Sequence, residues 1–392
     1  MIDSLRLINF KAFEDQLLQF KPLTLLSGLN STGKSSVLQS LLLLRQSYYA
    51  QAYMDLFNYL MSYSDFDLKL KGLLVDIGTA RDAFCERAKS NNIEFEIVWK
   101  GGAKNIWKFK YDLQKQNENI MKNMIETPGG IFIPSDKGNS NLFSLEKFQY
   151  LEAERIGPRP YNDLQDFDKR LSGKLGSKGE YTVDFLATWV NREDQNINDP
   201  KLIHPEAKSL NLIDQVEAWM REISPGIRLE TQANPEMGIV NIQYFYGDSN
   251  RYRATNVGFG ITYTLPIIVS VLSSSPGSLI LVENPEAHLH PRGQAKMGEL
   301  LALAASCGIQ VVIETHSDHV LNGIRLAVHG GKIKPEDVQL HYFQRQEKQG
   351  QAVTKVISPR IYRDGTIDRW PDGFFDEWEI SLDALLEPVQ GD

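Results

Sequence analysis

Residues 28–35, Gly-Leu-Asn-Ser-Thr-Gly-Lys-Ser, constrain the possible folds of this chain more than any other part of its sequence. They fit the pattern G-x-x-x-x-G-K-[ST], with the apolar run "LTLLS" before them and the leucine-rich run "VLQSLLLLRQ" after them. This pattern is meaningful when it joins a strand to a helix, and both flanks fit that context. A plain glycine-rich turn with a chance lysine is the alternative, and it leaves the flanks unexplained.

Each residue type in this loop has a physical role in holding a triphosphate. Gly28 and Gly33 let the backbone curl with its N–H groups pointing inward, and the following helix adds its positive amino end. Lys34 would place a positive charge between the β- and γ-phosphates, and Ser35 would offer its hydroxyl to Mg²⁺. We therefore expect ATP and Mg²⁺ as cofactors. The other loop residues expected at the nucleotide are Asn30, Ser31, Thr32 and Ser36.

Two apolar runs in the last third of the chain end in polar clusters. They read "GSLILVENPEAHLHP" and "IQVVIETHSDHVL", and the stretch between them, "RGQAKMGELLALAASCG", is an expected helix with a glycine stop at Gly308. A strand, a helix and a strand with polar residues at both strand ends are typical of a parallel α/β sheet that carries a site at that edge.

The first of these strand ends carries candidate catalytic residues. Glu283 directly follows the apolar run, where a carboxylate reaches Mg²⁺ through a water, so we expect it in the metal site. Asn284 comes next, and an amide can only orient an attacking water, whereas a carboxylate can also accept its proton. Glu286 is therefore the better candidate for the base. A solvated strand end is the alternative for both glutamates.

The second strand end carries His316. We expect this histidine to donate to the γ-phosphate or to hold the attacking water, and a core histidine bonded to backbone is the alternative. His316 together with His288, His290 and His319 suggests a metal cluster as a further alternative, because histidine and carboxylate are metal ligands. Two strand ends beside a γ-phosphate explain these residues better.

Composition narrows the class of protein. The formal net charge of −8 argues against a nonspecific polyanion binder, although a local basic groove would not show in this sum. The two cysteines, Cys85 and Cys307, offer neither a disulfide framework nor a thiolate metal pattern, which favours a reducing compartment. The charged amino terminus is no secretion signal, and no apolar run approaches the ~20 residues of a membrane helix. We expect a cytoplasmic protein without a membrane partner.

Outside the glycine-rich loop and the two polar strand ends, the spacing of apolar residues predicts further strands and helices. Alternating apolar residues predict strands near 2–10, 17–20 and 22–28. Farther on, "IEFEIVWKGGAKNIWKFKYDL" is an expected hairpin, "SLNLIDQVEAWMREIS" an expected helix, and "IRLETQA" with "GIVNIQYFYG" an expected antiparallel pair. Polar stretches at 115–145 and 190–207 are expected loops. The predicted fold class is α/β, with a mixed parallel and antiparallel sheet interrupted by an α+β insertion.

Four stretches occur in the order found in ABC-type ATPase heads of the RecF, SMC and OLD kind. They are "GLNSTGKSS", "VGFGITYTLP", "LILVENPEAHLHP" and "VVIETHSDHVL". The chain most resembles bacterial OLD-like AAA-type ATPases that end in a DUF3696 segment, because "YRDGTIDRWPDGFFDEWEISLDALL" looks like that segment and "YLEAERIGPRPY" like a stretch common in these ATPases. Residues 1–50 and 251–330 would then form one ATPase head, 51–250 an insertion or arm region, and 331–392 the DUF3696-like end.

The resemblance implies roles for individual residues. Lys34 and Ser35 match the phosphate-loop lysine and the Mg²⁺-binding serine, Glu283 matches the Walker B acid, and His316 matches the switch histidine. The signature motif of relatives falls on Gly258, Gly260 and Thr262 and would reach the γ-phosphate of a second subunit. Glycines that free the backbone amides at the start of a helix suit an anion, although a tight turn is the alternative.

The chain departs from its relatives at two positions. Tyr263 stands where the usual pattern has glutamine, and Asn284 stands where a glutamate is expected. These changes predict slow hydrolysis, or ATP used mainly to hold a dimer. The residues after His316 contain no Asp-x-Asp pair, so we expect no intrinsic nuclease.

The leading hypothesis is an ATPase that closes a homodimer or higher oligomer through its heads and controls a separately encoded effector, a nuclease in bacterial anti-phage defence. A DNA-binding repair ATPase of the RecF or SMC kind is the alternative, so nucleic acid stays open as a partner. A transporter subunit or a kinase fits the motifs less well.

The tail has an apolar helical face that we expect to dock on its own domain, with docking of a partner as the alternative. Its members are Phe374, Phe375, Trp378, Leu382, Leu385 and Leu386.

Overall fold

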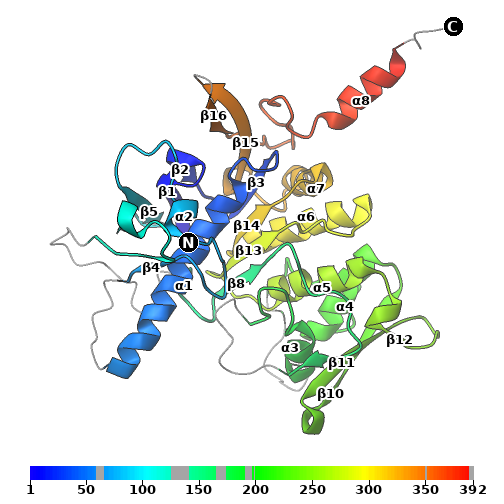
Figure 1. Ribbon diagram of the computed structural model, residues 1–392. Coiled ribbons are helices and arrows are strands. Elements are labelled where there is room, and N and C mark those ends of the chain that lie inside the picture. Colours follow the sequence, from blue (N-terminus) through cyan, green and yellow to red (C-terminus); the bar gives the residue numbers. More distant parts are fainter. Residues whose placement is uncertain are drawn as a thin grey trace.

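A six-stranded mixed sheet forms the centre of the molecule (Figure 1). The computed structural model describes residues 1–58, 66–124, 141–164, 174–189, 197, 199–348 and 351–387. The strand order is β16-β15-β3-β14-β13-β8, and all neighbours are parallel except β15 and β16. The strands are β3 (Leu23–Gly28), β8 (Phe148–Leu151), β13 (Leu279–Glu283), β14 (Gln310–Glu314), β15 (Val338–Lys348) and β16 (Gln351–Ile357).

Helices cover both faces of this sheet, which explains the continuous apolar runs of its inner strands. Along β14, Val311 and Ile313 join the core on one face, while Val312 joins the core on the other. The first core also contains residues of α5 (Phe259–Leu272), α6 (Pro291–Ser306) and α7 (Asp318–His329). The second contains residues of the long helix α1 (Lys34–Asn58).

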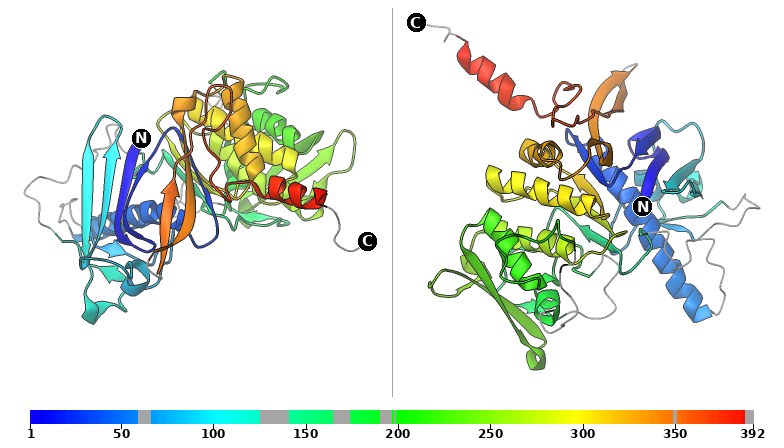
Figure 2. Two further views of the ribbon diagram at one scale, coloured as in Figure 1. Left: turned by 90° about the horizontal axis from the view of Figure 1, so that it is seen from above. Right: turned by 180° about the vertical axis from the view of Figure 1, so that it is seen from behind.

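A second, antiparallel sheet packs on the other side of α1, in the order β2-β1-β5-β6 (Figure 2). Its strands are β1 (Ile2–Phe10), β2 (Phe13–Gln19), β5 (Asn92–Trp99) and β6 (Lys104–Lys110). The expected hairpin is confirmed, with Phe95 opposite Trp107 and the turn at Gly101 and Gly102, whose φ angles are 100° and 88°. Short elements lie beside it: α2 (Ala80–Ala83), the strands β4 (Leu68–Lys69) and β7 (Ile120–Met121), and a 3₁₀ turn at Leu113–Lys115.

A lobe built from the middle of the chain joins the first core. It contains α3 (Thr182–Trp189), α4 (Leu212–Ile223), β9 (Asn162–Asp163), β10 (Ile227–Asn234), β11 (Ile239–Tyr246) and β12 (Tyr252–Arg253), with 3₁₀ turns at Pro235–Met237 and Ala254–Asn256. The expected helix and antiparallel strand pair are confirmed. The expected loops at 115–145 and 190–207 lie partly outside the described residues. The α/β fold with a mixed parallel and antiparallel sheet is confirmed. The range 51–250, expected as an insertion, also supplies β5 and β6 to the sheet of β1 and β8 to one edge of the central sheet.

The tail differs from its prediction. Helix α8 (Glu377–Leu386) extends away from the body of the molecule, and none of its residues is buried (Figures 1 and 2). Trp378 is 70% exposed and Leu385 is 80% exposed, so the expected docking on its own domain is wrong. Phe374 and Phe375 lie before the helix rather than on its face. Phe374 is buried against Tyr342, with ring centroids 5.3 Å apart, so the chain is anchored before α8 begins.

Candidate nucleotide-binding site

The carboxyl ends of β3, β13 and β14 meet at one edge of the central sheet. Glu283 at the end of β13 is paired in register with Glu314 at the end of β14, and Glu314 is paired with Leu26 of β3. The glycine-rich loop follows β3 immediately. The structure thus brings together residues that are more than two hundred positions apart in the sequence.

The loop has the backbone conformation that its glycines predict. Gly28 has a φ of 138° and Gly33 a φ of 102°, which side chains rarely adopt. A Cβ atom on Gly28 would lie 2.2 Å from the carbonyl oxygen of Phe343 on β15. Replacement of Gly28 by any other residue would therefore push the loop away from the sheet.

Lys34 begins α1 and folds back over the loop. Its Nζ donates to the carbonyl oxygens of Gly28, at 3.0 Å, and Leu29, at 2.7 Å. The Thr32 hydroxyl also donates to the Leu29 carbonyl, at 2.7 Å. Burial lowers the pKa of Lys34, and the charge of Glu314 opposes this shift. The lysine ammonium is therefore held at the centre of the loop, at the amino end of α1.

Ser35 contacts an acid that the motif analysis did not select. Its hydroxyl donates to Oε1 of Glu314 at 2.7 Å. Glu314 is only 6% exposed, and its Oε2 atom has no hydrogen-bond partner in the described structure. Burial raises the pKa of this carboxyl to about 7, and the charge of Glu283 adds to the effect. The signal was present in the sequence, because Glu314 also ends a buried apolar run, as Glu283 does.

Glu283 is held by neighbours from β8 and the segment after it. Its Oε1 accepts a hydrogen bond from the Tyr150 hydroxyl at 2.8 Å, and burial raises its pKa. The buried Arg155 donates to the carbonyl oxygens of Glu283 and Asn284, both at 2.6 Å. Asn284 has a φ of 43°, so Arg155 stabilises a backbone turn that a non-glycine residue rarely adopts. The stretch "YLEAERIGPRPY" therefore shapes the strand end that carries Glu283.

Glu286 joins the two strand ends. Its carboxylate accepts from the Thr315 hydroxyl at 2.7 Å and from the backbone N–H of His316 at 2.9 Å. The His316 side chain is exposed, and its pKa is lowered first by partial burial and then by the charge of Lys34. Lys34 and His316 therefore lie near the same edge of the sheet. The role of Glu286 as a base stays a prediction, since both of its oxygens already accept hydrogen bonds from the chain.

The signature residues lie at the amino end of α5, next to the turn after β13. Gly258 caps the helix, and a Cβ on Gly260 would lie 2.5 Å from the carbonyl oxygen of His288. The Tyr263 ring packs edge-on against His288, with centroids 4.7 Å apart. Thr262, the third expected residue, has a hydroxyl without a hydrogen-bond partner among the described residues. The expected helix start at the glycines is confirmed, and this end of α5 is packed on His288 in the turn after β13.

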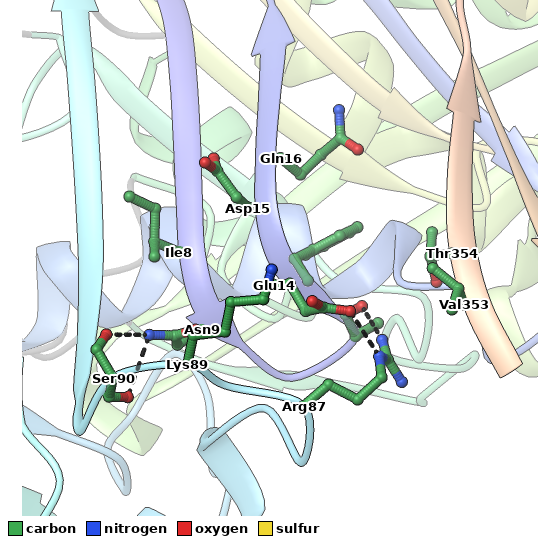
Figure 3. Close-up of a pocket in the computed structure, with 12 residues that line it drawn as sticks. Ile8, Asn9, Glu14, Asp15, Gln16, Arg87, Lys89, Ser90, Val353 and Thr354 are labelled. Carbon is green, nitrogen blue, oxygen red and sulfur yellow. Dashed lines mark hydrogen bonds and ion pairs between the residues drawn. The ribbon is translucent and has the colours of Figure 1, made fainter. Parts of the chain in front are cut away.

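A cavity of about 430 Å³ lies beside the phosphate loop (Figure 3). Its walls come from β1, β2, the segment before β5, and β16, and they include the ion pair between Arg87 and Glu14 at 2.9 Å. Two of its lining residues contact the loop directly. The Thr354 hydroxyl donates to the Thr32 carbonyl at 3.0 Å, and the Phe13 ring lies against Gly33.

A glycine-rich loop between a parallel strand and a helix, with acids ending the adjacent strands, defines the P-loop class of nucleotide-binding proteins. Residues 23–322 match the family model described as "AAA domain, putative AbiEii toxin, Type IV TA system", and the chain belongs to this AAA family. Residues 333–385 match the model "Protein of unknown function (DUF3696)", which confirms the expected carboxyl-terminal segment. An ATPase domain with a P-loop is thereby confirmed.

Solved structures of SMC heads show distant likeness to the chain. One is the SMC head bound to the C-winged helix domain of ScpA, with 13% identity over 91% of this chain and 97% of that one, and a TM-score of 0.46. The SMC head domain from Thermotoga maritima has 12% identity over 91% and 98%, with a TM-score of 0.42. The SMC head with an extended coiled coil from Pyrococcus furiosus has 12% identity over 98% and 99%, with a TM-score of 0.46. A comparison with curated proteins found no match. Among the described helices, none combines the length and the apolar character needed to cross a bilayer.

Proposed function

We propose that the protein binds Mg-ATP at the carboxyl edge of its central sheet and hydrolyses it slowly as an ABC-type dimeric switch. The observation that carries this proposal is the convergence of Lys34, Ser35 and the paired acids Glu283 and Glu314 at one edge. A lysine ammonium at a helix amino end suits phosphate, and hydroxyl and carboxylate oxygens suit Mg²⁺. When bound, Mg²⁺ would neutralise charge on the phosphates.

The turn after β13 supports slow turnover. Asn284 follows Glu283, and its amide can orient a water but cannot take up a proton. Glu286 is turned toward Thr315 and His316, which its two oxygens hold in place. In our proposal Glu286 mainly positions residues 315–316, here called the switch segment, and His316 orients the terminal phosphate or the water. The missing second carboxylate at position 284 then limits the rate.

The cavity beside the loop is proposed to take the nucleoside. Its volume falls in the range of small-molecule sites, and it is joined to the loop through Thr354 and Phe13. Arg87 and Glu14 offer polar groups to the cavity, while Phe13, which is only 2% exposed, connects its wall to the loop. Base and sugar would thus lie between β16 and the β1–β2 turn, with the phosphates directed toward the sheet edge.

Dimer formation and effector control complete the proposal. The amino end of α5 presents Phe259, which is 54% exposed, and Gly258, beside which a Cβ would meet no atom within 4 Å. One side of the helix start is packed on His288, but the side of Gly258 and Phe259 is open and suits the phosphates of an ATP bound by a second subunit. The exposed helix α8 suits a separately encoded effector, which we propose to be a nuclease. The description of the matched family names a putative toxin of a type IV toxin–antitoxin system. This description, together with the resemblance to OLD-like ATPases, is the reason for proposing an anti-phage role.

The test compares the wild type with Lys34→Ala, using Lys334→Ala, at an exposed lysine remote from the loop, as the matched control. Fluorescent ATP binding and light-scattering mass measurements are made with and without ATP and Mg²⁺. The wild type and the control should bind ATP and gain mass with it, while Lys34→Ala should do neither. Normal nucleotide binding by Lys34→Ala would remove the assignment of the loop. ATP-sensitive binding to DNA by the wild type, without any change in mass, would favour the repair ATPase instead.

A further inference from the structure

The proposed function uses Glu314 only as one of two acids at the sheet edge and leaves its individual contacts unexplained. It ends the central strand β14, next to the phosphate-loop strand β3 on one side and to β13 with Glu283 on the other. One of its oxygens accepts the Ser35 hydroxyl at 2.7 Å. The other oxygen, Oε2, has no hydrogen-bond partner in the described structure, although the residue is buried and only 6% exposed.

A purely structural role accounts poorly for this arrangement. A buried polar atom without a partner costs free energy, and native proteins leave few of them. Glu283 and Glu286 add like charge at the same sheet edge, and the effect of both on Glu314 is repulsive. Lys34 acts in the opposite sense, but its Nζ donates to the loop carbonyls of Gly28 and Leu29. An apolar residue at the end of β14 would avoid these costs.

The orientation of the Ser35 hydroxyl gives the second argument. A serine that binds a cation through its oxygen must point its proton away from that cation, toward an acceptor. Oε1 of Glu314 is such an acceptor, at 2.7 Å. The Ser35 oxygen lone pairs and the unpartnered Oε2 atom are then both left for a cation. An all-oxygen set of one hydroxyl and carboxylates suits hard divalent ions such as Mg²⁺ and Mn²⁺.

We propose that Glu314 is a second carboxylate of the magnesium site, binding the cation of Mg-ATP through Oε2 while Oε1 orients the Ser35 hydroxyl. The site then consists of Ser35, Glu283 and Glu314, with the nucleotide and waters filling the remaining positions. This inference rests on the proposed binding of Mg-ATP. Glu314 directly precedes Thr315 and His316 in the chain. A cation bound by Glu314 would therefore be connected to His316 through the backbone of these residues.

The first experiment uses Glu314→Gln, which keeps an acceptor for Ser35 and removes the charge. Glu236→Gln, on the exposed turn between β10 and β11, is the matched control. Titration with Mn²⁺ in the presence of ATP, followed by electron paramagnetic resonance, measures cation affinity, and ATP binding in EDTA is measured separately. Glu314→Gln should bind Mn²⁺ about ten- to a hundredfold more weakly, with ATP binding in EDTA unchanged or tighter. The control should match the wild type in both measurements.

A second measurement needs no variant. Fe²⁺ in place of Mg²⁺, with ascorbate and peroxide, produces radicals that cut the backbone near the bound cation, and mass spectrometry locates the cuts. ATP-dependent cuts should appear near 35, near 283 and near 314. Cuts near 35 and 283 but not near 314 would overturn the proposal.

The outcomes separate this inference from the function on which it rests. Mn²⁺ affinity within twofold of the wild type in a folded Glu314→Gln variant would show that Glu314 only accepts the Ser35 proton. The same result would follow if the carboxyl were neutral in the complex, and it would equally overturn the proposal. A wild type that binds ATP neither in EDTA nor with Mn²⁺ would instead remove the proposed nucleotide function. If Glu314→Gln does not fold, Glu314→Asp and the iron cleavage pattern decide.

Discussion

Glu286 holds the switch segment by two hydrogen bonds, one to the backbone N–H of His316 at 2.9 Å and one to the hydroxyl of its neighbour Thr315 at 2.7 Å. This connection joins the turn after β13 to the segment after β14. Hydrogen bonds of one side chain therefore connect the two strand ends directly. The histidine expected at the γ-phosphate is positioned by an acid that the sequence suggested as a base.

The two roles of Glu286 predict different results for Glu286→Gln and Glu286→Ala. Glutamine keeps one oxygen acceptor for the His316 N–H and can donate to Thr315, whereas alanine loses both contacts. We expect Glu286→Gln to hydrolyse ATP within about tenfold of the wild type and Glu286→Ala to be clearly slower, with ATP binding retained in both. Phosphate release at saturating ATP measures this. An equal loss in both variants, about 10²–10⁴-fold, would identify Glu286 as the general base.

The burial of Phe374 just before α8 predicts that residues up to this position contribute to stability and that α8 does not. Phe374 is fully buried against Tyr342 and Trp370, so Phe374→Ala should lower the free energy of unfolding by about 3–5 kcal/mol. Deletion of residues 377–392 should change it by less than about 1 kcal/mol, because α8 buries nothing. Trp378→Ala, at a residue 70% exposed, is the aromatic control. Urea denaturation provides the comparison, and a strongly destabilised deletion would mean that α8 packs on the chain in solution.

The close contact of α6 with α7 predicts that two glycines are intolerant of a side chain. A Cβ on Gly323 would lie 2.0 Å from the carbonyl oxygen of Ala295, and one on Gly298 would lie 2.2 Å from that of Val320. Gly323→Ala should therefore destabilise the protein by about 1–3 kcal/mol. Gly258→Ala should change stability by less than about 1 kcal/mol, because that glycine has a φ of −62° and open space around it and only its preference at the helix N-cap is lost. Thermal unfolding of both variants checks this, and equal melting temperatures would contradict it.

Buried His341 predicts a loss of stability in mild acid. Its Nδ1 lies 2.8 Å from the Ser358 hydroxyl and its Nε2 2.8 Å from the Gln19 carbonyl oxygen, which can only accept, so the neutral ring carries its proton on Nε2. Burial lowers its pKa from 6.5 to about 4. As the pH falls from 6.5 toward 4, His341 therefore takes up a proton in the unfolded chain but stays neutral in the folded chain. The free energy of unfolding falls as a result. The loss amounts to at most about 3 kcal/mol.

The matching experiment compares the wild type with His341→Gln across this pH range. The variant should show a smaller decline in the free energy of unfolding between pH 6.5 and pH 4.5, whatever its stability at neutral pH. Other titrating groups, including Glu314, contribute to both proteins and cancel in the difference. Parallel pH profiles would show that His341 stays neutral in the unfolded chain or is protonated in the folded one.

Local patterns were sufficient to predict many elements of this protein. The phosphate loop, the hairpin at 93–111 and the strands that end at Glu283 and Glu314 depend on neighbours in the chain, through glycine conformations and alternating apolar residues. The helix α4 was likewise visible from its apolar spacing. In each case the interactions that select the conformation lie within a few residues of one another.

Tertiary structure decided which strands and which side chains are neighbours in space. The pairing of Glu283 with Glu314, and the contact of Ser35 with Glu314, depend on the order of strands in the sheet, which no local pattern specifies. The same is true of β8, which reaches the sheet from the middle of the chain, and of α8, whose apolar residues look like a docking face but stay exposed. The sequence by itself determined the phosphate loop, the hairpin, α4 and the strands that end at Glu283 and Glu314, because those choices are local. Only the folded chain decided which acids share the site, because that follows from contacts between residues hundreds of positions apart.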